Sequence, residues 1–200
     1  MSQPSISDVS PEDDGGRISR SGYQYQDLCA LRYSIRAACG AMWDEVWCES
    51  HDDIVLYAAR DGHERYRFVQ VKFVGQAGQH WTPHQVCAHE PSRTVHHSIL
   101  CKLLSKDRYA GVSDFRLATN LDSNQLLEPM TYRWNRTERP LSNSCQGVLD
   151  LANRLRDWVP SNGRSIEDHV LRFAIESHAV DPEDMESMFG TWILAPASIC

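Results

Sequence analysis

Hydrophobic positions near the start of the chain follow a helical period. Between residues 24 and 39, apolar side chains recur every three or four positions, which is the spacing of one face of an α-helix. Ser21-Gly22 supplies a start signal, and Gly40 supplies a stop signal. The pattern therefore predicts a first helix, whose apolar face carries Leu28, Leu31, Ile35 and Cys39.

The pattern then changes to short segments with the composition of strands. Residues 45–49, 54–59 and 65–73 are rich in β-branched and aromatic side chains and are bounded by polar turn residues. Asp61-Gly62 separates the last two segments, and this dipeptide favours a tight hairpin turn. We therefore predict one strand followed by a β-hairpin.

The remaining pattern mixes loops and helices with one further strand. Residues 75–91 are predicted to form a loop with a polar, aromatic tip at His80 and Trp81. The order of elements predicts an α/β core with a helical C-terminal extension. The later predictions are a helix at 94–104, a strand at 115–120, helices at 148–158 and 166–177, and a short helix that opens at Asp181.

The composition is that of a soluble globular protein. Apolar residues make up 42% of the 200 residues and charged residues 24%, and no segment is apolar for long enough to form a membrane span or a secretory signal. The seven cysteines are odd in number and include no CxxC pair, which favours free thiols in a reducing cytoplasm. Residues 1–16 are rich in Ser, Asp and Gly and are predicted to form a flexible arm.

Charge is distributed unevenly along the chain. The formal net charge is −7, which argues against a general nucleic-acid coat protein. Residues 15–39 nevertheless carry four arginines against one acid, for a net charge of +3. Residues 161–200 carry seven acids against two arginines, for a net charge of −5. The basic end could face phosphate, while the acidic end faces solvent or a partner.

Two pairs of polar residues flank the predicted hairpin. Asp52 and Asp53 lie at the mouth of one strand, and Gln70 and Lys72 lie near the end of the next. Alternate side chains of a strand point to the same face, so Gln70 and Lys72 project together near Asp53, while Val71 points into the core. An acid and a second oxygen ligand can hold Mg²⁺ or Mn²⁺, and a lysine can position the attacking water of phosphodiester hydrolysis. The Val71 carbonyl is a further candidate ligand.

Several blocks of sequence, taken in order, resemble a known nuclease superfamily. The acid, hairpin and Gln-Val-Lys pattern is similar to the PD-(D/E)XK nucleases in their QxK variant. More closely, the chain resembles the double-stranded DNA endonuclease domain of CD-NTase-associated effector proteins of bacterial anti-phage defence. The blocks are GGRISRSGYQYQ (15–26), CESHDDIVL (48–56), FVQVKF (68–73), Trp81-Thr82 and FRLATN (115–120).

The resemblance implies a fold and a set of site residues. The fold is a restriction-endonuclease-like core, a mixed sheet flanked by helices, which we expect at residues 17–125, with the helical extension at 126–200. Asp53 and Gln70 are expected at the metal and Lys72 at the water. Many relatives have a carboxylate where this chain has Gln70, so Glu49 or Asp52 is expected to complete the site. Gln26 lines it, and Arg17 and Arg20 are candidate DNA contacts.

The resemblance also implies regulation by partners. Effectors of this kind place the nuclease before a nucleotide-sensing or ATPase module, and too few residues follow position 120 for a full sensor. The apolar ending LAPASIC favours the N-terminal part of a longer protein, and a module on another chain is the alternative. We expect activity to be gated by oligomerisation through that module. We also expect double-stranded DNA to be cut with little sequence demand, because no recognition helix or zinc finger is visible.

Other interpretations of the same residues stay open. The chain is alternatively a nuclease fold retained for DNA binding or assembly without turnover, or a docking domain that uses the acidic helices after Val148. Trp81 is either a packing anchor or a base-stacking residue. Arg93, His96 and His97 are alternatively residues that flank DNA. The spacing of one further group allows zinc, namely Cys87, His89, His96, His97 and Cys101.

Overall fold

The computed structural model describes residues 15–40, 42–49, 52–75, 79–89, 95–109, 111–131, 145–160 and 162–178. The flexible arm predicted at residues 1–16 lies almost entirely outside this part of the chain. The short helix predicted to open at Asp181 lies outside it as well.

The described strands form two sheets. They are β1 (Glu45–Cys48), β2 (Ile54–Arg60), β3 (His63–Lys72), β4 (His80–Trp81), β5 (Val112–Thr119), β6 (Asp122–Ser123) and β7 (Phe173–Ser177). The central sheet has the order β1-β2-β3-β5-β7 and the second pairs β4 with β6. The first three strands of the central sheet run antiparallel, whereas β3, β5 and β7 are parallel to one another. The predicted mixed sheet is therefore confirmed.

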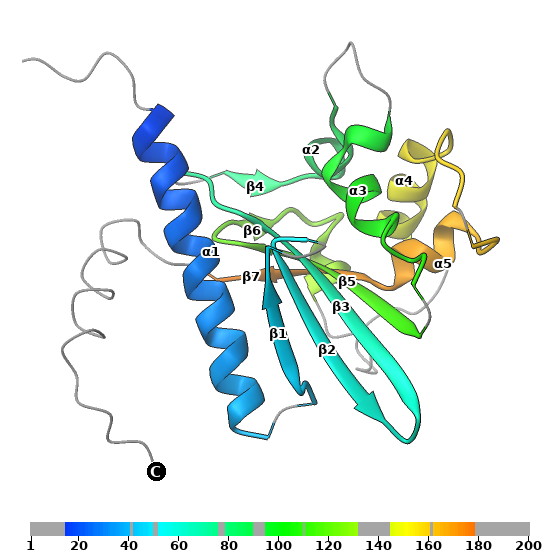
Figure 1. The fold of residues 1–200 in the computed structure, drawn as a ribbon. Coiled ribbons are helices and arrows are strands. Elements are labelled where there is room, and N and C mark those ends of the chain that lie inside the picture. Colours follow the sequence, from blue (N-terminus) through cyan, green and yellow to red (C-terminus); the bar gives the residue numbers. More distant parts are fainter. Residues whose placement is uncertain are drawn as a thin grey trace, which may run out of the picture.

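Helices cover both faces of the central sheet (Figure 1). The long helix α1 lies against one face, and the short helices lie against the other. The sheet and its two helical layers confirm the predicted α/β class. The helices are α1 (Gly15–Ala38), α2 (Pro83–Cys87), α3 (Ile99–Leu104), α4 (Gln146–Arg154) and α5 (Ile166–Leu171), with 3₁₀ turns η2 (Val95–His97) and η3 (Glu128–Thr131).

The predicted hairpin is confirmed, and its turn explains its register. Asp61 and Gly62 both have positive φ angles, of 53° and 77°, as a two-residue type I′ turn requires. This turn pairs Arg60 with His63 and continues as far as Ile54 opposite Val69. The register places the start of β2 beside the end of β3.

Helix α1 confirms the first predicted helix, but the face predicted from apolar spacing is wrong. The chain is already helical at Gly15, and the helix continues through Ser21-Gly22. Leu31 and Ile35 are 40% and 41% exposed. A different row is buried against β2 and β3, namely Tyr25, Cys29 and Tyr33. Tyrosine rings are large apolar groups with a polar tip, so they bury more area than the leucines while their hydroxyls reach partners.

The opposite face of the sheet packs on helices α2 to α5. The cluster joins strand residues such as Phe68 and Phe115 to Leu100 of α3 and Leu151 of α4. The described residues after position 125 therefore share a core with the hairpin. The predicted helix at 148–158 is observed over a shorter span as α4.

The predicted helix at 166–177 is wrong in its second half. After α5 the chain forms β7, which lies parallel to β5. Phe173, Ala174 and Ile175 are all buried, so this strand lacks the alternation that distinguishes strand from helix. A parallel strand with helices on both sides is apolar throughout, and for this reason its period is ambiguous.

Two predictions for residues 75–104 also need correction. The predicted loop at 75–91 contains β4 and α2, and α2 begins at a capping box of Thr82 and Gln85. The predicted helix at 94–104 is divided. The Ser98 side chain accepts a hydrogen bond from the Cys101 backbone N–H and starts α3 only at Ile99.

Candidate active site

The hairpin register brings Asp53 and Gln70 together at one end of the sheet. Asp53 Oδ2 accepts hydrogen bonds from the Gln70 side-chain amide and from the Val71 backbone N–H, the latter over 2.7 Å. Gln70 and Lys72 are on the strand face opposite to Val69 and Val71, which pack into the α1 core. The predicted proximity of Asp53 and Gln70 is therefore observed.

Lys72 is the last residue of β3 and is partly buried. It forms no ion pair with a carboxylate of the described residues, although it lies close enough to lower the pKa of Asp52. Its ammonium group therefore stays available for a ligand beside the acids.

Glu49 lies in the turn that leads into the site, and Gln26 of α1 contacts it. The Glu49 backbone N–H donates to the Asp53 carbonyl over 3.1 Å, and Glu49 has a positive φ of 52°. The Glu49 carboxylate accepts a hydrogen bond from the Gln26 side-chain amide of α1. This contact fixes the helix to the turn before Asp53, so both residues lie near the site, as expected of residues that line it.

Asp52 is the most unusual carboxyl group of the site. Its Oδ1 accepts from the Asp53 backbone N–H over 3.1 Å, whereas its Oδ2 is buried without a hydrogen-bond partner among the described residues. Burial raises the pKa of Asp52 to about 7, against the opposing effects of Lys106 and Lys72. A buried carboxylate oxygen without a partner is costly, and a bound cation would supply the missing interaction.

Lys106 is a basic residue near this site that the sequence interpretation missed. It follows α3 directly, and its charge lowers the pKa of Asp52 more than Lys72 does. The two residues are 54 positions apart (106 − 52), and no local pattern links them. Only the packing of α3 on the sheet brings them close.

Asn120 holds the strand segment that follows Lys72. Its side-chain amide donates to the Val74 carbonyl over 2.8 Å, and its Oδ1 accepts from the Val74 N–H over 2.9 Å. Next to it, Thr119 Oγ1 accepts from the Trp81 indole N–H over 2.8 Å. Trp81 is 7% exposed and is therefore a packing anchor. The Asn120 side chain thus satisfies the backbone groups of Val74, two residues after Lys72, in place of a neighbouring strand.

Replacing Asn120 with leucine is expected to lower the free energy of unfolding by about 1–3 kcal/mol, because the backbone groups of Val74 lose their partner. Chemical denaturation measures the loss, and amide hydrogen exchange at Val74 should accelerate. Asn153→Leu on the exposed surface of α4 is the matched control. Equal effects of the two substitutions would contradict a specific role for Asn120.

The alternative zinc group does not assemble in the described part of the chain. Among these residues, no group of three or more His, Cys, Asp and Glu side chains is placed to hold a metal ion. Within the zinc group itself, Cys101 Sγ and His96 Nδ1 are 4.0 Å apart, and His89 and His97 are exposed. Burial raises the pKa of Cys87 and Cys101 to about 12, so both remain protonated thiols.

The candidate DNA contacts are only partly described. Arg20 is exposed on α1. The Arg17 side chain and Arg93 lie outside the described residues. His96 and His97 are exposed beside α3. Their contacts with DNA remain predictions.

An acid at the mouth of a hairpin, beside Gln-x-Lys at the end of the next strand, gives the mixed sheet the features of a restriction-endonuclease-like core. The family model for "Cap4, dsDNA endonuclease domain" matches residues 14–190, and the chain belongs to this family. The match includes every described element from α1 to β7. No curated protein and no solved structure gives a significant match. Within the described residues, no helix combines the length and apolarity needed to cross a bilayer.

Proposed function

We propose that this protein is a metal-dependent endonuclease that hydrolyses double-stranded DNA with low sequence specificity, as an effector of bacterial anti-phage defence. The proposal rests on the contact between Asp53 and Gln70 and on Lys72, which ends the strand that contains Gln70. Membership of the Cap4 dsDNA endonuclease family supports the substrate.

The residues at the strand ends fit a hard divalent cation. Asp53 and Gln70 offer carboxylate and amide oxygens, and the Asp52 oxygen without a partner adds a third donor nearby. The Gln70 amide presents its NH₂ to Asp53, and a half-turn of the amide would present its oxygen. Mg²⁺ usually takes one or two carboxylates and keeps several waters, so it needs no larger cluster of acids. We assign Mg²⁺, or Mn²⁺, to Asp53, Gln70 and the Val71 carbonyl, with Glu49 as an additional candidate.

The chain's own residues have separate tasks in this proposal. A divalent cation held by these residues would supply neutralisation of charge at the scissile phosphate and polarisation of a water molecule. Lys72, which has no carboxylate partner among the described residues, holds that water and stabilises the negative charge that develops on the phosphate. Val71 N–H and the β2–β3 register fix the Asp53 carboxylate. Low specificity follows if most contacts are with phosphates, which carry no sequence information.

We further propose that the nuclease acts in the cytoplasm and is gated by partners. A homo-oligomer, or a sensor or ATPase module on the same or another chain, would control cutting. An unregulated nuclease would damage its host, which gives a reason for such control. If the isolated chain cuts plasmid at full rate as a monomer, this gating is excluded.

A second candidate function is a nuclease fold retained for DNA binding or assembly without turnover. The neutral Gln70, in place of a carboxylate, favours this alternative, because an amide binds Mg²⁺ more weakly. Equal DNA affinity in EDTA and in Mg²⁺, with no nicking, would support it.

Supercoiled plasmid incubated with the purified protein tests the proposal. Mg²⁺ or Mn²⁺ is expected to convert the plasmid to nicked and linear forms, and EDTA to stop the reaction. Asp53→Asn keeps the side-chain shape but removes the charge, so it should weaken Mn²⁺ binding measured by calorimetry and lower cleavage by about 10²-fold or more. Asp150→Asn, in the solvent-facing ion pair of Asp150 with Arg154 on α4, is the control. Cleavage by the Asp53 variant at the wild-type rate would overturn the assignment.

A further inference from the structure

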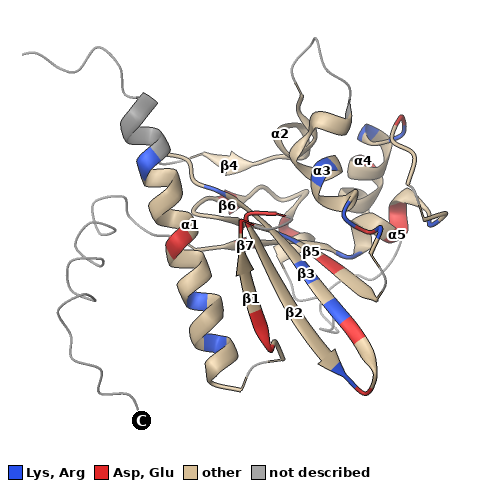
Figure 2. Ribbon diagram, in the orientation of Figure 1, with Lys and Arg blue, Asp and Glu red and all other residues tan. Residues whose placement is uncertain are grey.

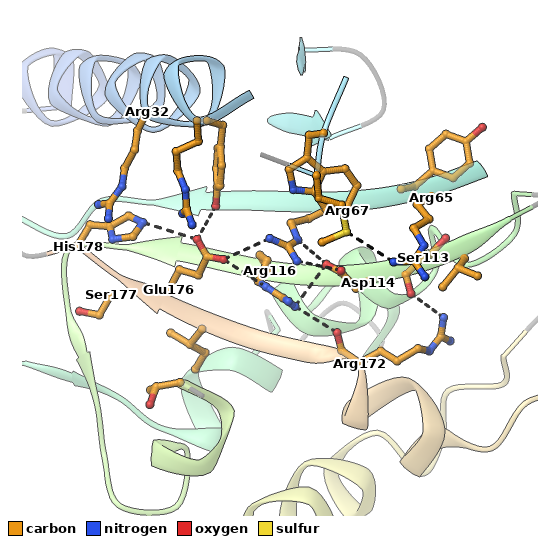
Figure 3. A pocket seen from close by; sticks show the side chains of 18 of the residues that line it. Arg32, Arg65, Arg67, Ser113, Asp114, Arg116, Arg172, Glu176, Ser177 and His178 are labelled. Atoms are coloured by element: carbon orange, nitrogen blue, oxygen red, sulfur yellow. Dashed lines mark hydrogen bonds and ion pairs between the residues drawn. The ribbon is translucent and has the colours of Figure 1, made fainter. Parts of the chain in front are cut away.

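On the face of the central sheet that packs against α1, the last two strands, β5 and β7, carry charged rather than apolar side chains. On β2 and on the second half of β3, the side chains that face α1 are apolar, such as Ile54 and Val69. On β5 and β7 the corresponding positions are Asp114, Arg116 and Glu176, which form ion pairs. Between α1 and these strands the described residues leave a pocket of about 970 Å³ (Figure 3). We call it the arginine pocket, after Arg32, Arg36, Arg65, Arg67 and Arg116 in its lining.

The floor of the arginine pocket is a fixed network of ion pairs. Arg67 donates to both oxygens of Asp114, over 2.6 and 3.0 Å, and lies over the Trp43 ring at 4.9 Å. Arg116 is 3% exposed and lies 3.4 Å from Asp114 and 3.3 Å from Glu176. The charges of two arginines and two acids cancel, so the floor is close to neutral.

The rim of the pocket supplies the positive charge. Arg32 and Arg36 are one turn apart on α1, and Arg65 lies on β3 across the opening. All three are exposed, and none forms an ion pair with a carboxylate of the described residues. Among the described residues of the lining, Asp122 is the one further acid. Five arginines against three acids give an excess of two positive charges, leaving aside Arg172, which pairs with Asp107.

One end of the pocket lies at the end of the sheet that carries the candidate cleavage site, although the pocket is on the α1 face and Lys72 is on the opposite face. Lys72 pairs with Thr119 in the strand register, and Thr119 pairs with Ser177, which lines the pocket. His178 follows and lies near Arg32 in Figure 3. A polyanion that passes from Lys72 around this end of the sheet would therefore meet the pocket near Arg32, whereas Arg65 lies at the other end of β3, beside the hairpin turn. Figure 2 shows basic positions along α1, although the whole chain has a net charge of −7.

We propose that the arginine pocket binds the phosphate backbone of DNA outside the cleavage site. The proposal rests on the proposed nuclease function. Guanidinium groups are suited to phosphate because they present a planar fork of N–H donors. The rim arginines form no ion pair with a carboxylate of the described residues, so they lose none when a phosphate binds.

Arg32→Gln/Arg36→Gln tests the pocket in a Lys72→Ala background, which allows DNA binding to be measured without cutting. Affinity for a short fluorescein-labelled duplex is measured by anisotropy over a series of salt concentrations. We expect the double substitution to weaken binding about tenfold and to reduce the salt slope by about 2, because two phosphate contacts are lost. Arg65→Gln, on a different element, should weaken binding in the same direction.

Arg154→Gln/Arg156→Gln is the matched control, because it removes the same charge from the end of α4 and the turn that follows it, on the other face of the sheet. If the rim and control variants bind DNA equally, the pocket proposal is wrong. The same conclusion follows if the rim substitutions abolish binding of ATP or pyrophosphate but leave the duplex affinity unchanged, since the pocket would then serve free phosphate ligands. Plasmid cleavage by the wild-type protein, measured in parallel, reports separately on the proposed nuclease function.

Discussion

Replacement of Lys72 by alanine is expected to lower the rate of DNA cleavage by about 10²- to 10³-fold, the effect typical of removing a group that stabilises charge in a transition state. Lys72 pairs with no carboxylate of the described residues, so the free energy of unfolding should change little. Plasmid cleavage in Mg²⁺ measures the rate, and urea denaturation measures stability.

Lys102→Ala is the control for this experiment, because Lys102 is an exposed lysine on α3. It should leave both cleavage and stability near wild type. Undiminished cleavage by the Lys72 variant would exclude the assigned role. A loss of cleavage accompanied by unfolding would instead mean that Lys72 stabilises the strand end, contrary to the prediction.

Substitution of Asp107 by alanine is expected to give the largest loss of stability, about 3–5 kcal/mol, because it breaks a buried ion pair and leaves the other partner unpaired. Asp107 is 7% exposed and accepts hydrogen bonds from the Arg172 guanidinium. Arg172 Nη1 donates one of them over 2.9 Å. His169 Nε2 lies 3.1 Å from Asp107 Oδ2. Arg172 is itself 5% exposed, so it would remain charged without a carboxylate.

The same network predicts how stability depends on pH. Burial alone would raise the pKa of Asp107, but hydrogen bonds from Arg172 and His169 outweigh it and hold the pKa well below the ordinary value of 3.8. A carboxyl group with a lowered folded-state pKa contributes stability above its unfolded pKa and loses it as pH falls further. The Asp107 variant should therefore lose less stability than the wild type when the pH is lowered from 5 to about 2.

Urea denaturation at several pH values tests both parts of the Asp107 prediction. Asp150→Ala is the control, because Asp150 forms an exposed i, i+4 pair with Arg154, a type of pair worth only about 0.3–0.5 kcal/mol. Similar losses for the two variants would mean that the buried network contributes no more than a surface pair.

The parts of the fold that local chemistry specifies were predictable from sequence. The β2–β3 hairpin depends on an Asp-Gly turn and on strand composition within some twenty residues, and its register follows from the turn. The proximity of Asp53 to Gln70 follows from that register and from the two-residue period of strands. Resemblance to a nuclease family added the roles of these residues, and these roles are still predictions.

The buried face of α1 shows why apolar spacing was insufficient. Leu28, Leu31 and Ile35 form a regular apolar row, yet Tyr25 and Tyr33 face the sheet. The Tyr33 hydroxyl donates a hydrogen bond of 2.7 Å to Glu176, which lies 143 positions later in the sequence. This distant partner makes the tyrosine face favourable, and no local period can reveal it.

Sequence by itself thus determined the hairpin, the α/β class and the proximity of Asp53 to Gln70, because turns, strand period and short spacings act within neighbouring residues. Only the tertiary structure decided that 173–177 form β7, that Asn120 pairs with Val74, and that arginines from α1, β3 and β5 line one pocket. These features join segments dozens of residues apart. Their stability depends on which distant groups become buried together, and the packing of the whole chain determines that choice.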